Sequence, residues 1–338
     1  MSEPLLSLRD LSIAYRVGAG ETIAVEGASF DVAPGQIVGL VGESGCGKTT
    51  LARSLTRVLA SNARIAGGKA HFGGQDIMGL SERDMNALRW REIAFIPQSA
   101  MNSLDPVYTV GSQLSEVLIK RGGMGRAEAR KRAEELFEWV GIETNRLGDY
   151  PHQFSGGMRQ RVAIALALAL DPKLIIADEP VTALDVIVQR QILDQLRALK
   201  ERLGISVILV THDISVVAYV CDRVVVMYAG EVVETGPMAA TLTAPAHPYT
   251  MGLRNAFPDL AGAAGVLTPI DGAPPDLAAP PKGCRFAPRC PFVQDRCLAT
   301  TPGLSTFEPD HLAACHRLDE ATILRTKAMD QETWQVPA

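Results

Sequence analysis

Residues 42–50 (GESGCGKTT) carry the most specific chemical pattern in the chain. They match the spacing G-x-x-x-x-G-K-[ST] of loops that bind phosphate groups. The glycines let successive backbone N–H groups face one anion, and the start of a following helix adds the positive end of its dipole. In such a loop Lys48 reaches the outer phosphates and the Thr49 hydroxyl binds Mg²⁺. The predicted nucleotide-binding residues are Gly42, Glu43, Ser44, Gly45, Cys46, Gly47, Lys48, Thr49 and Thr50.

Two carboxylates, Asp178 and Glu179, follow an apolar run over 173–177. A strand that merely ends in acidic turn residues, with no catalytic role, would have the same sequence pattern. With a phosphate loop upstream, however, the first carboxylate can hold the Mg²⁺ shell through water and the second can polarise an attacking water. The pair therefore predicts hydrolysis of the bound nucleotide.

A second candidate anion site lies at residues 154–161 (FSGGMRQR). Ser155 is a good N-cap, and two glycines open a predicted helix of small and apolar residues through 170. Exposed N–H groups at a helix start favour an anion. Because two phosphate sites cannot both serve one nucleotide, we expect a head-to-tail pair in which each subunit completes its partner's site.

The elements that must position these groups follow from hydrophobic periodicity. Residues 5–41 alternate between polar and apolar, which predicts antiparallel strands, and 36–41 form a buried strand before the phosphate loop. The apolar runs 173–178 and 205–211 predict central parallel strands. Amphipathic patterns predict helices over 126–139 and 186–203.

Composition bounds the class of protein. The chain has 338 residues, of which 47% are hydrophobic and 21% charged, and its formal net charge of −5 argues against nucleic acid as a partner. The longest apolar run, 162–170, falls far short of the roughly 20 residues that span a bilayer. The N-terminus lacks the pattern of a secretory signal. These features predict a cytosolic protein whose membrane association comes through a partner.

The C-terminal part changes character near residue 244. Eight prolines over 245–283 predict a linker or irregular packing. Cys284, Cys290, Cys297 and Cys315 then crowd into a short stretch, which in a reducing compartment favours metal over disulfides. Their spacing lacks a C-x₂-C pair and fits a [4Fe–4S] cluster; the alternatives are Zn²⁺, with His311 or His316 recruited, and plain thiols or disulfides.

In order and spacing, these motifs resemble the nucleotide-binding subunit of ATP-binding cassette (ABC) transporters, over roughly residues 5–250. The resemblance implies that Tyr15 stacks on adenine and that Gln98 touches Mg²⁺ and water and senses a transmembrane partner. It implies that Glu179 is the general base and that His212 contacts the γ-phosphate. The residues implied to hold Mg²⁺ are Thr49, Gln98 and Asp178.

The resemblance also assigns two segments to a pair of facing subunits, which close around two ATP molecules and thereby move membrane subunits. The residues implied to bind the partner's ATP are Ser155, Gly156, Gly157, Met158 and Gln160. The residues implied to cross the dimer interface are Ala183, Leu184 and Asp185. Met158 departs from the glutamine common in the superfamily, but the segment resembles the branch that imports peptides and nickel.

Further segments resemble the dipeptide and oligopeptide importers of that branch, namely residues 101–106 (MNSLDP), 247–250 (HPYT) and the cysteine-bearing tail. This implies peptide as cargo, with nickel, glutathione or an oligosaccharide as alternatives, and it too implies a [4Fe–4S] cluster. The implied partners are a second, related ATPase subunit, two membrane permease subunits and an extracytoplasmic substrate-binding protein, at the cytoplasmic face of the inner membrane. A soluble ABC ATPase is disfavoured because the chain carries neither a second cassette nor a coiled-coil insertion.

We therefore expect an α/β fold of the phosphate-loop ABC class. Its nucleotide-binding domain should cover 1–255, with a RecA-like core, an antiparallel β subdomain and a helical subdomain at about 100–165. Residues 256–320 should form a linker and a four-cysteine metal-bearing extension, and 321–338 a loosely held tail.

Overall fold

The computed structural model describes residues 3–18, 20–100, 103–182, 184–256 and 268–334, which form two compact units. The first unit contains residues 33–37 and 79–210, and the second contains 3–32, 38–78 and the chain from 211 onward. No helix within the described ranges is both long and apolar enough to cross a membrane.

Parallel strands lie at the centre of the first unit. β7 (Leu174–Asp178) pairs with β6 (Ile93–Ile96) on one side and with β8 (Ser206–Thr211) on the other. Every residue of β7 and β8 is buried, which explains their continuous apolar sequences. The prediction of parallel strands at these two runs is confirmed.

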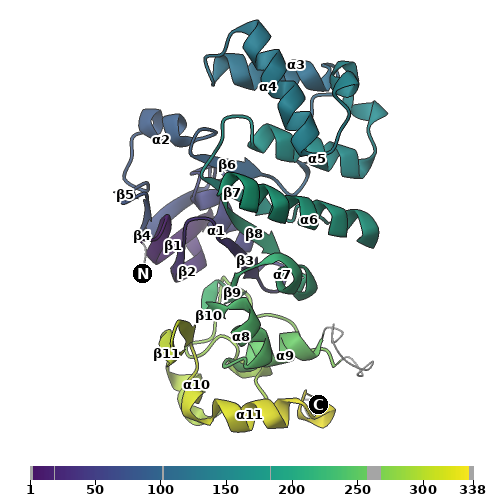
Figure 1. Cartoon of the computed structure of the whole chain (residues 1–338). Helices are drawn as coiled ribbons and strands as arrows, with labels where there is room; N and C mark the ends of the chain where they lie inside the picture. Colours follow the sequence, from purple (N-terminus) through teal and green to yellow (C-terminus); the bar gives the residue numbers. More distant parts are fainter. Residues whose placement is uncertain (1–2, 19, 101–102, 183, 257–267, 335–338) are drawn as a thin grey trace. The chain divides into compact units, whose positions relative to one another are not determined.

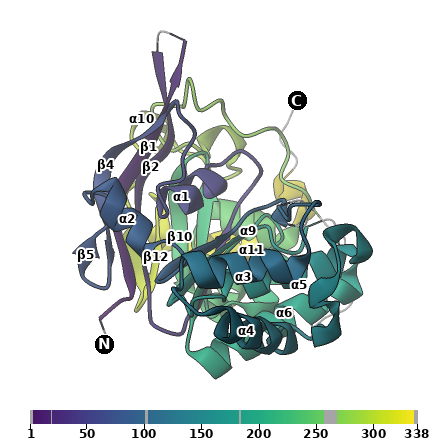
Figure 2. The same cartoon turned by 90° about the horizontal axis from the view of Figure 1, so that it is seen from above.

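The helices of the first unit include α2 (Glu82–Leu88), α3 (Val110–Lys120), α4 (Arg126–Trp139), α5 (Gly156–Ala167) and α6 (Val186–Leu203). α3, α4 and α5 gather side by side in the region predicted to be helical (Figure 2). Two short 3₁₀ turns, Thr144–Gly148 and Pro151–Gln153, connect α4 to α5. The bounds of α4 and α6 agree with the predicted ranges.

An antiparallel sheet begins the second unit. It contains β1 (Leu6–Val17), β2 (Gly20–Val32), β4 (Ala63–Phe72) and β5 (Gln75–Asp76), in the order β2-β1-β4-β5. Figure 1 shows α1 (Lys48–Ser54) close to β1 and β2, with which it makes contact. The alternating sequence of residues 5–32 places one face of β1 and β2 inward, as predicted.

The remaining strands of the second unit surround β9 (Arg223–Tyr228). β3 (Ile37–Val41) pairs parallel to β9 through residues 38–41, and β10 (Glu231–Pro237) pairs antiparallel to it. β12 (His311–Ala313) joins β10 to β11 (Ser305–Glu308). The helical elements here are α7 (Ile214–Val220), α8 (Met238–Thr243), α9 (Pro248–Asn255), α10 (Asp295–Ala299) and α11 (Ala321–Ala328), with 3₁₀ turns at Ala287–Arg289, Leu318–Glu320 and Gln331–Trp334.

The prediction of a linker or irregular packing over 245–283 is wrong at its start, where α9 forms a regular buried helix. Pro248 occupies the first turn of α9, a position where proline lacks no hydrogen bond and its fixed φ suits the helix. The His247 Nδ1 atom caps the helix by accepting from the Tyr249 N–H at 3.0 Å. Residues 257–267 of this stretch lie outside the described residues.

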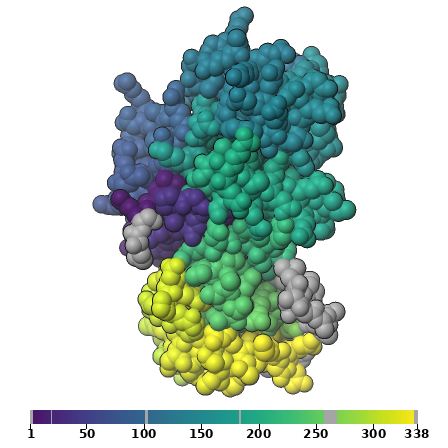
Figure 3. Space-filling view, viewed as in Figure 1, coloured from purple at the N-terminus to yellow at the C-terminus, as the bar shows by residue number. Residues whose placement is uncertain are grey.

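The prediction of a loosely held tail is also wrong for residues 321–334. Leu324 and Trp334 are buried in the same apolar cluster as Tyr228, Tyr249 and Phe286. The Trp334 Nε1–H donates to the Ala328 carbonyl at 2.8 Å, so its polar atom is satisfied inside that cluster. The space-filling view shows the C-terminal residues (yellow) against residues near 240–256 (green), where α11 contacts α9 (Figure 3).

Candidate functional site

The phosphate loop of the second unit runs from β3 into α1, as its sequence predicts. Gly42, Gly45 and Gly47 have φ values of 155°, 79° and 98°, in the region that favours glycine. A Cβ at Gly42 would lie 2.1 Å from the Met227 carbonyl oxygen, and one at Gly47 would lie 2.5 Å from that of Ala24. The loop therefore requires glycine both for its backbone conformation and for its close packing.

The Lys48 side chain is held within this loop. Its Nζ atom donates to the carbonyl oxygens of Gly42 at 2.7 Å and Glu43 at 2.8 Å, and the residue is only 6% exposed. Cys46 lies beside it and is also buried; this burial raises the pKa of the Cys46 thiol. The loop thus holds one localised positive charge against its own backbone carbonyls.

Tyr15 lies next to the helix that follows the loop. Its hydroxyl is 3.1 Å from the Oγ1 atom of Thr50 in α1, so the partly buried ring on β1 stands beside the phosphate loop. Thr49 occupies the first turn of α1, and Ser44 and Gly45 are exposed at the tip of the loop. His212 belongs to the same unit and is exposed in the turn between β8 and α7.

In the first unit, the predicted carboxylates stand at the carboxyl end of β7. Asp178 is completely buried, and Glu179 has φ 48°, an unusual conformation for a residue other than glycine. The Glu179 Oε2 atom accepts from Gln98 Nε2 at 2.8 Å and from the Thr182 hydroxyl at 3.2 Å. The structure thus brings together Gln98 and Glu179, which the sequence separates by 81 residues, and holds the Glu179 carboxylate in one orientation.

The second anion segment also lies in the first unit. Ser155 caps α5, its hydroxyl accepting from the Met158 N–H at 3.3 Å, so the predicted N-cap is confirmed. Gly156 begins the helix, and Gln160 is buried one turn further. The unusual Met158 is accommodated by Arg146, whose Nη1 atom lies 3.3 Å from its sulfur.

The predicted interface loop leads into α6, whose first turn packs against this segment. Asp185 caps α6 by accepting from the Val188 N–H at 2.9 Å, and a Cβ at Gly157 would lie 2.5 Å from Val188 Cγ1. Leu184 is half-buried, and Ala183 lies outside the described residues. Val186 and Ile187, which follow Asp185 directly, are apolar but 78% and 73% exposed.

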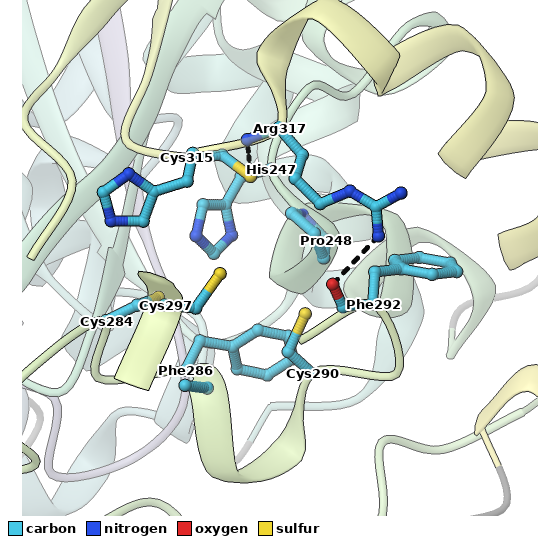
Figure 4. A pocket seen from close by; sticks show the side chains of 11 residues that line it. His247, Pro248, Cys284, Phe286, Cys290, Phe292, Cys297, Cys315 and Arg317 are labelled. Carbon is cyan, nitrogen blue, oxygen red and sulfur yellow. Dashed lines mark hydrogen bonds between the residues drawn. The ribbon is translucent and has the colours of Figure 1, made fainter. Parts of the chain in front are cut away.

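The four C-terminal cysteines line one pocket of the second unit, together with His247, Pro248, Phe286, Ala287, Phe292, His316 and Arg317. Figure 4 shows the sulfur atoms of Cys290, Cys297 and Cys315 turned toward the space between the side chains that line the pocket. The structure thus brings together four cysteines that lie as far as 31 positions apart in the sequence. None of the four forms a disulfide.

Burial raises the pKa of Cys284 to about 11 and that of Cys290 to about 12, and it also raises the pKa of Cys315. No three His, Cys, Asp or Glu side chains of the described ranges are grouped closely enough to hold one metal ion. His311, a suggested zinc ligand, does not line the pocket. Its Nε2 atom lies 2.7 Å from Glu234 Oε1. His316 does line it.

The sequence did not identify two residues that hold the phosphate loop, Tyr249 and Arg289. The Glu43 N–H donates to the Tyr249 hydroxyl at 2.9 Å, and Arg289 Nη1 lies 2.8 Å from Glu43 Oε2. Tyr249 belongs to the HPYT segment, which the sequence marked only by its resemblance to peptide importers. For Arg289, the available signal was a basic residue among buried aromatic and cysteine positions, which is too weak to identify a contact.

A phosphate loop after a parallel strand and a carboxylate pair at a strand end define a phosphate-loop ATPase, and the capped glycine segment at α5 narrows this to the ABC class. In agreement, residues 25–182 match the family described as ABC transporter. Residues 233–297 match the family described as oligopeptide/dipeptide transporter, C-terminal region.

Individual proteins agree with these matches. The chain is 46% identical to a probable peptide ABC transporter ATP-binding protein of Sinorhizobium fredii, over 95% of this chain and 97% of that one. It is 45% identical to the oligopeptide transport ATP-binding protein OppD of Salmonella typhimurium, over 93% of each chain. A dimeric ATP-binding cassette, MJ0796, solved with ADP and phosphate, superimposes with a TM-score of 0.62 at 30% identity over 69% of this chain and 98% of that one. The chain therefore belongs to the ABC transporter family of ATP-binding proteins and is an ATPase.

Proposed function

We propose that this chain is the ATP-hydrolysing subunit of an importer that moves dipeptides or oligopeptides across the cytoplasmic membrane. The observation that carries the proposal is the match of residues 233–297 to the C-terminal region of oligopeptide/dipeptide transporters. The same cargo appears in the names of relatives that align over nearly the whole chain, including the dipeptide transport ATP-binding protein DppD of Bacillus subtilis at 43% identity.

In this proposal the phosphate loop and Tyr15 bind ATP, and Glu179 activates the attacking water. Lys48 supplies positive charge to the outer phosphates, and His212 contacts the γ-phosphate. The hydrogen bonds from Gln98 and Thr182 orient the Glu179 carboxylate for the proton that it accepts.

The Mg²⁺ ligands are proposed to be Thr49, Gln98 and Asp178. All three supply hard oxygen donors, the type that this cation prefers. When bound, Mg²⁺ neutralises charge that develops on the phosphate oxygens.

The chain is proposed to act in a pair, with the segment from Ser155 to Gln160 facing ATP on the second subunit. Support comes from the exposure of Ser155 and of Val186 and Ile187 beside the interface loop, since apolar side chains of this size are usually covered. The resemblance favours a related but different ATPase chain as the second subunit.

A second exposed apolar pair, Val107 and Tyr108, follows Gln98 and is proposed to face a permease subunit. Two such permease subunits and an extracytoplasmic substrate-binding protein complete the proposed importer. The ATPase would then lie at the cytoplasmic face of the inner membrane as a peripheral protein.

Deletion of this chain from its host should abolish uptake of labelled dipeptides and oligopeptides. The wild-type chain should restore uptake, and Glu179→Gln should not, because transport requires hydrolysis. Uptake of labelled nickel, glutathione and an oligosaccharide is measured in the same strains. Loss of one of these with normal peptide uptake would show that the cargo assignment is wrong.

We also propose that Cys284, Cys290, Cys297 and Cys315 hold a [4Fe–4S] cluster with a structural role. The support is that all four line one apolar pocket without forming disulfides. Thiols whose pKa is raised by burial become thiolates when a positively charged group binds them. Because the thiolates around a cluster stand farther apart than those around one ion, the absence of a three-ligand group in the described ranges argues more against zinc than against a cluster.

Purified without oxygen, the chain should be brown and contain about four iron and four sulfide per chain, as expected for one such cluster. Cys290→Ala should remove both the colour and the iron. The control is Cys221→Ala, since Cys221 lies outside the pocket and should leave the iron content unchanged. Stoichiometric zinc, or a colourless protein with four free thiols, would contradict the proposal.

A further inference from the structure

We propose that Tyr249 and Arg289 are positioning residues for nucleotide binding, and that they act by holding Glu43 of the phosphate loop. This inference rests on the proposed use of the loop for ATP. The C-terminal segment, from residue 245 onward, would then help to shape the nucleotide site directly. This role is separate from any role of its cysteines.

Tyr249 fixes one peptide group of the loop. The peptide bond between Gly42 and Glu43 offers its N–H to the Tyr249 hydroxyl at 2.9 Å and its carbonyl oxygen to Lys48 Nζ at 2.7 Å. The peptide plane is therefore held at both ends. Gly42, which begins this peptide, has the unusual φ of 155°, so the plane has an orientation that local preferences alone do not impose.

Arg289 holds the side chain of the same residue. Its Nη1 atom lies 2.8 Å from Glu43 Oε2, while its Nε and Nη2 atoms donate to the carbonyl oxygens of Asp271 at 2.9 Å and Ile270 at 3.1 Å. These carbonyls belong to the same C-terminal part of the chain as Arg289. They fix the guanidinium in the position from which it contacts Glu43. Its planar arrangement of donors suits such a bridge.

Buried aromatic residues pack around Tyr249 and contact Arg289. Tyr249 is fully buried, and its ring centroid lies 4.6 Å from that of Tyr228 and 5.4 Å from that of Phe286. Tyr228 also accepts from Arg289 Nη1 at 3.3 Å. Packed aromatic rings of this kind restrict the movement of the Tyr249 hydroxyl and the Arg289 guanidinium. These two groups therefore hold Glu43 in a defined place.

The same supports border the cysteine pocket. Phe286, which packs on Tyr249, lines that pocket, and Arg289 directly precedes Cys290. Iron content must therefore be measured in every variant, so that an effect on the loop is not confused with loss of a bound group.

The test compares Arg289→Ala and Tyr249→Phe with the wild-type chain. Both variants should raise the Kd for ATP about five- to tenfold, within the usual range for coupling between sites. In the assembled importer KM for ATP should rise by a similar factor, while kcat at saturating ATP stays within about twofold, since neither residue touches the reacting atoms. Arg289→Lys should be intermediate, because it keeps the charge but loses the planar set of donors.

The matched control is Arg223→Ala. Arg223 is another mostly buried arginine that ties the C-terminal segment to a strand, through Asp310 at 2.7 Å, but it does not contact the phosphate loop. Its removal should leave the Kd unchanged. Circular dichroism and iron content are recorded for every variant; if Arg289→Ala does not fold, Tyr249→Phe and Glu43→Ala carry the test.

A double-mutant cycle tests whether Arg289 affects ATP binding through Glu43. In a Glu43→Ala background, Arg289→Ala should add little further loss of affinity, since its partner is already gone. Folded variants with wild-type Kd and KM would overturn the proposal, and so would fully additive losses in the cycle. If instead the wild-type chain itself binds no ATP, the proposed use of the loop is wrong, which is a separate and recognisable outcome.

Discussion

Glu179→Gln should abolish ATP turnover, lowering kcat at least about 100-fold, while ATP still binds with a Kd within about twofold of wild type. General-base catalysis contributes about 10²–10⁴-fold, and an amide cannot accept the proton that a carboxylate accepts. The replacement is nearly isosteric and still offers an oxygen to Gln98 Nε2 and the Thr182 hydroxyl, so the local structure should persist. Phosphate release and calorimetric ATP binding measure the two quantities.

The same variant should accumulate the closed pair of ATPase subunits in ATP, because hydrolysis is the step that opens it. Size-exclusion chromatography with light scattering, on the complex with its partner ATPase, reads this directly. Glu201→Gln is the control: this exposed residue lies on α6 and should leave turnover unchanged. Normal hydrolysis by Glu179→Gln would show that another group is the base.

Lys48→Ala should weaken ATP binding about 100-fold, near the upper end of what a charge-assisted hydrogen bond of about 1.5–3 kcal/mol contributes, since each 1.4 kcal/mol is tenfold in Kd. The variant loses the positive charge that the loop holds. It also leaves the carbonyl oxygens of Gly42 and Glu43 without the donor that holds them at 2.7 and 2.8 Å. Titration with a fluorescent ATP analogue measures the loss.

Lys69→Ala serves as the control for Lys48→Ala. Lys69 is an exposed residue of β4 and should not change the Kd. The melting temperature separates a local effect from unfolding: Lys48→Ala should stay folded at ambient temperature, because the surrounding glycine conformations and the packing of Cys46 remain. Wild-type affinity in a folded Lys48→Ala chain would exclude this loop as the phosphate site.

Local patterns predicted helices and strands well where an apolar face or a continuous apolar run determines which residues are buried. The amphipathic stretches that became α4 and α6 needed no knowledge of distant residues. The C-terminal part was predicted poorly for a physical reason. Whether Trp334 or the residues of α9 are buried depends on which surfaces are available elsewhere in the fold, and proline content alone does not say that.

The sequence by itself determined which class of ATPase this chain is, since the phosphate loop, the carboxylate pair and the capped glycine segment are recognised by residue types at short fixed spacings. Only the tertiary structure decided what holds these groups in place. Tyr249 lies 206 residues from Glu43 and Arg289 lies 246 residues from it, yet both contact it. Contacts over such separations arise from the packing of strands and helices, and no local pattern records them.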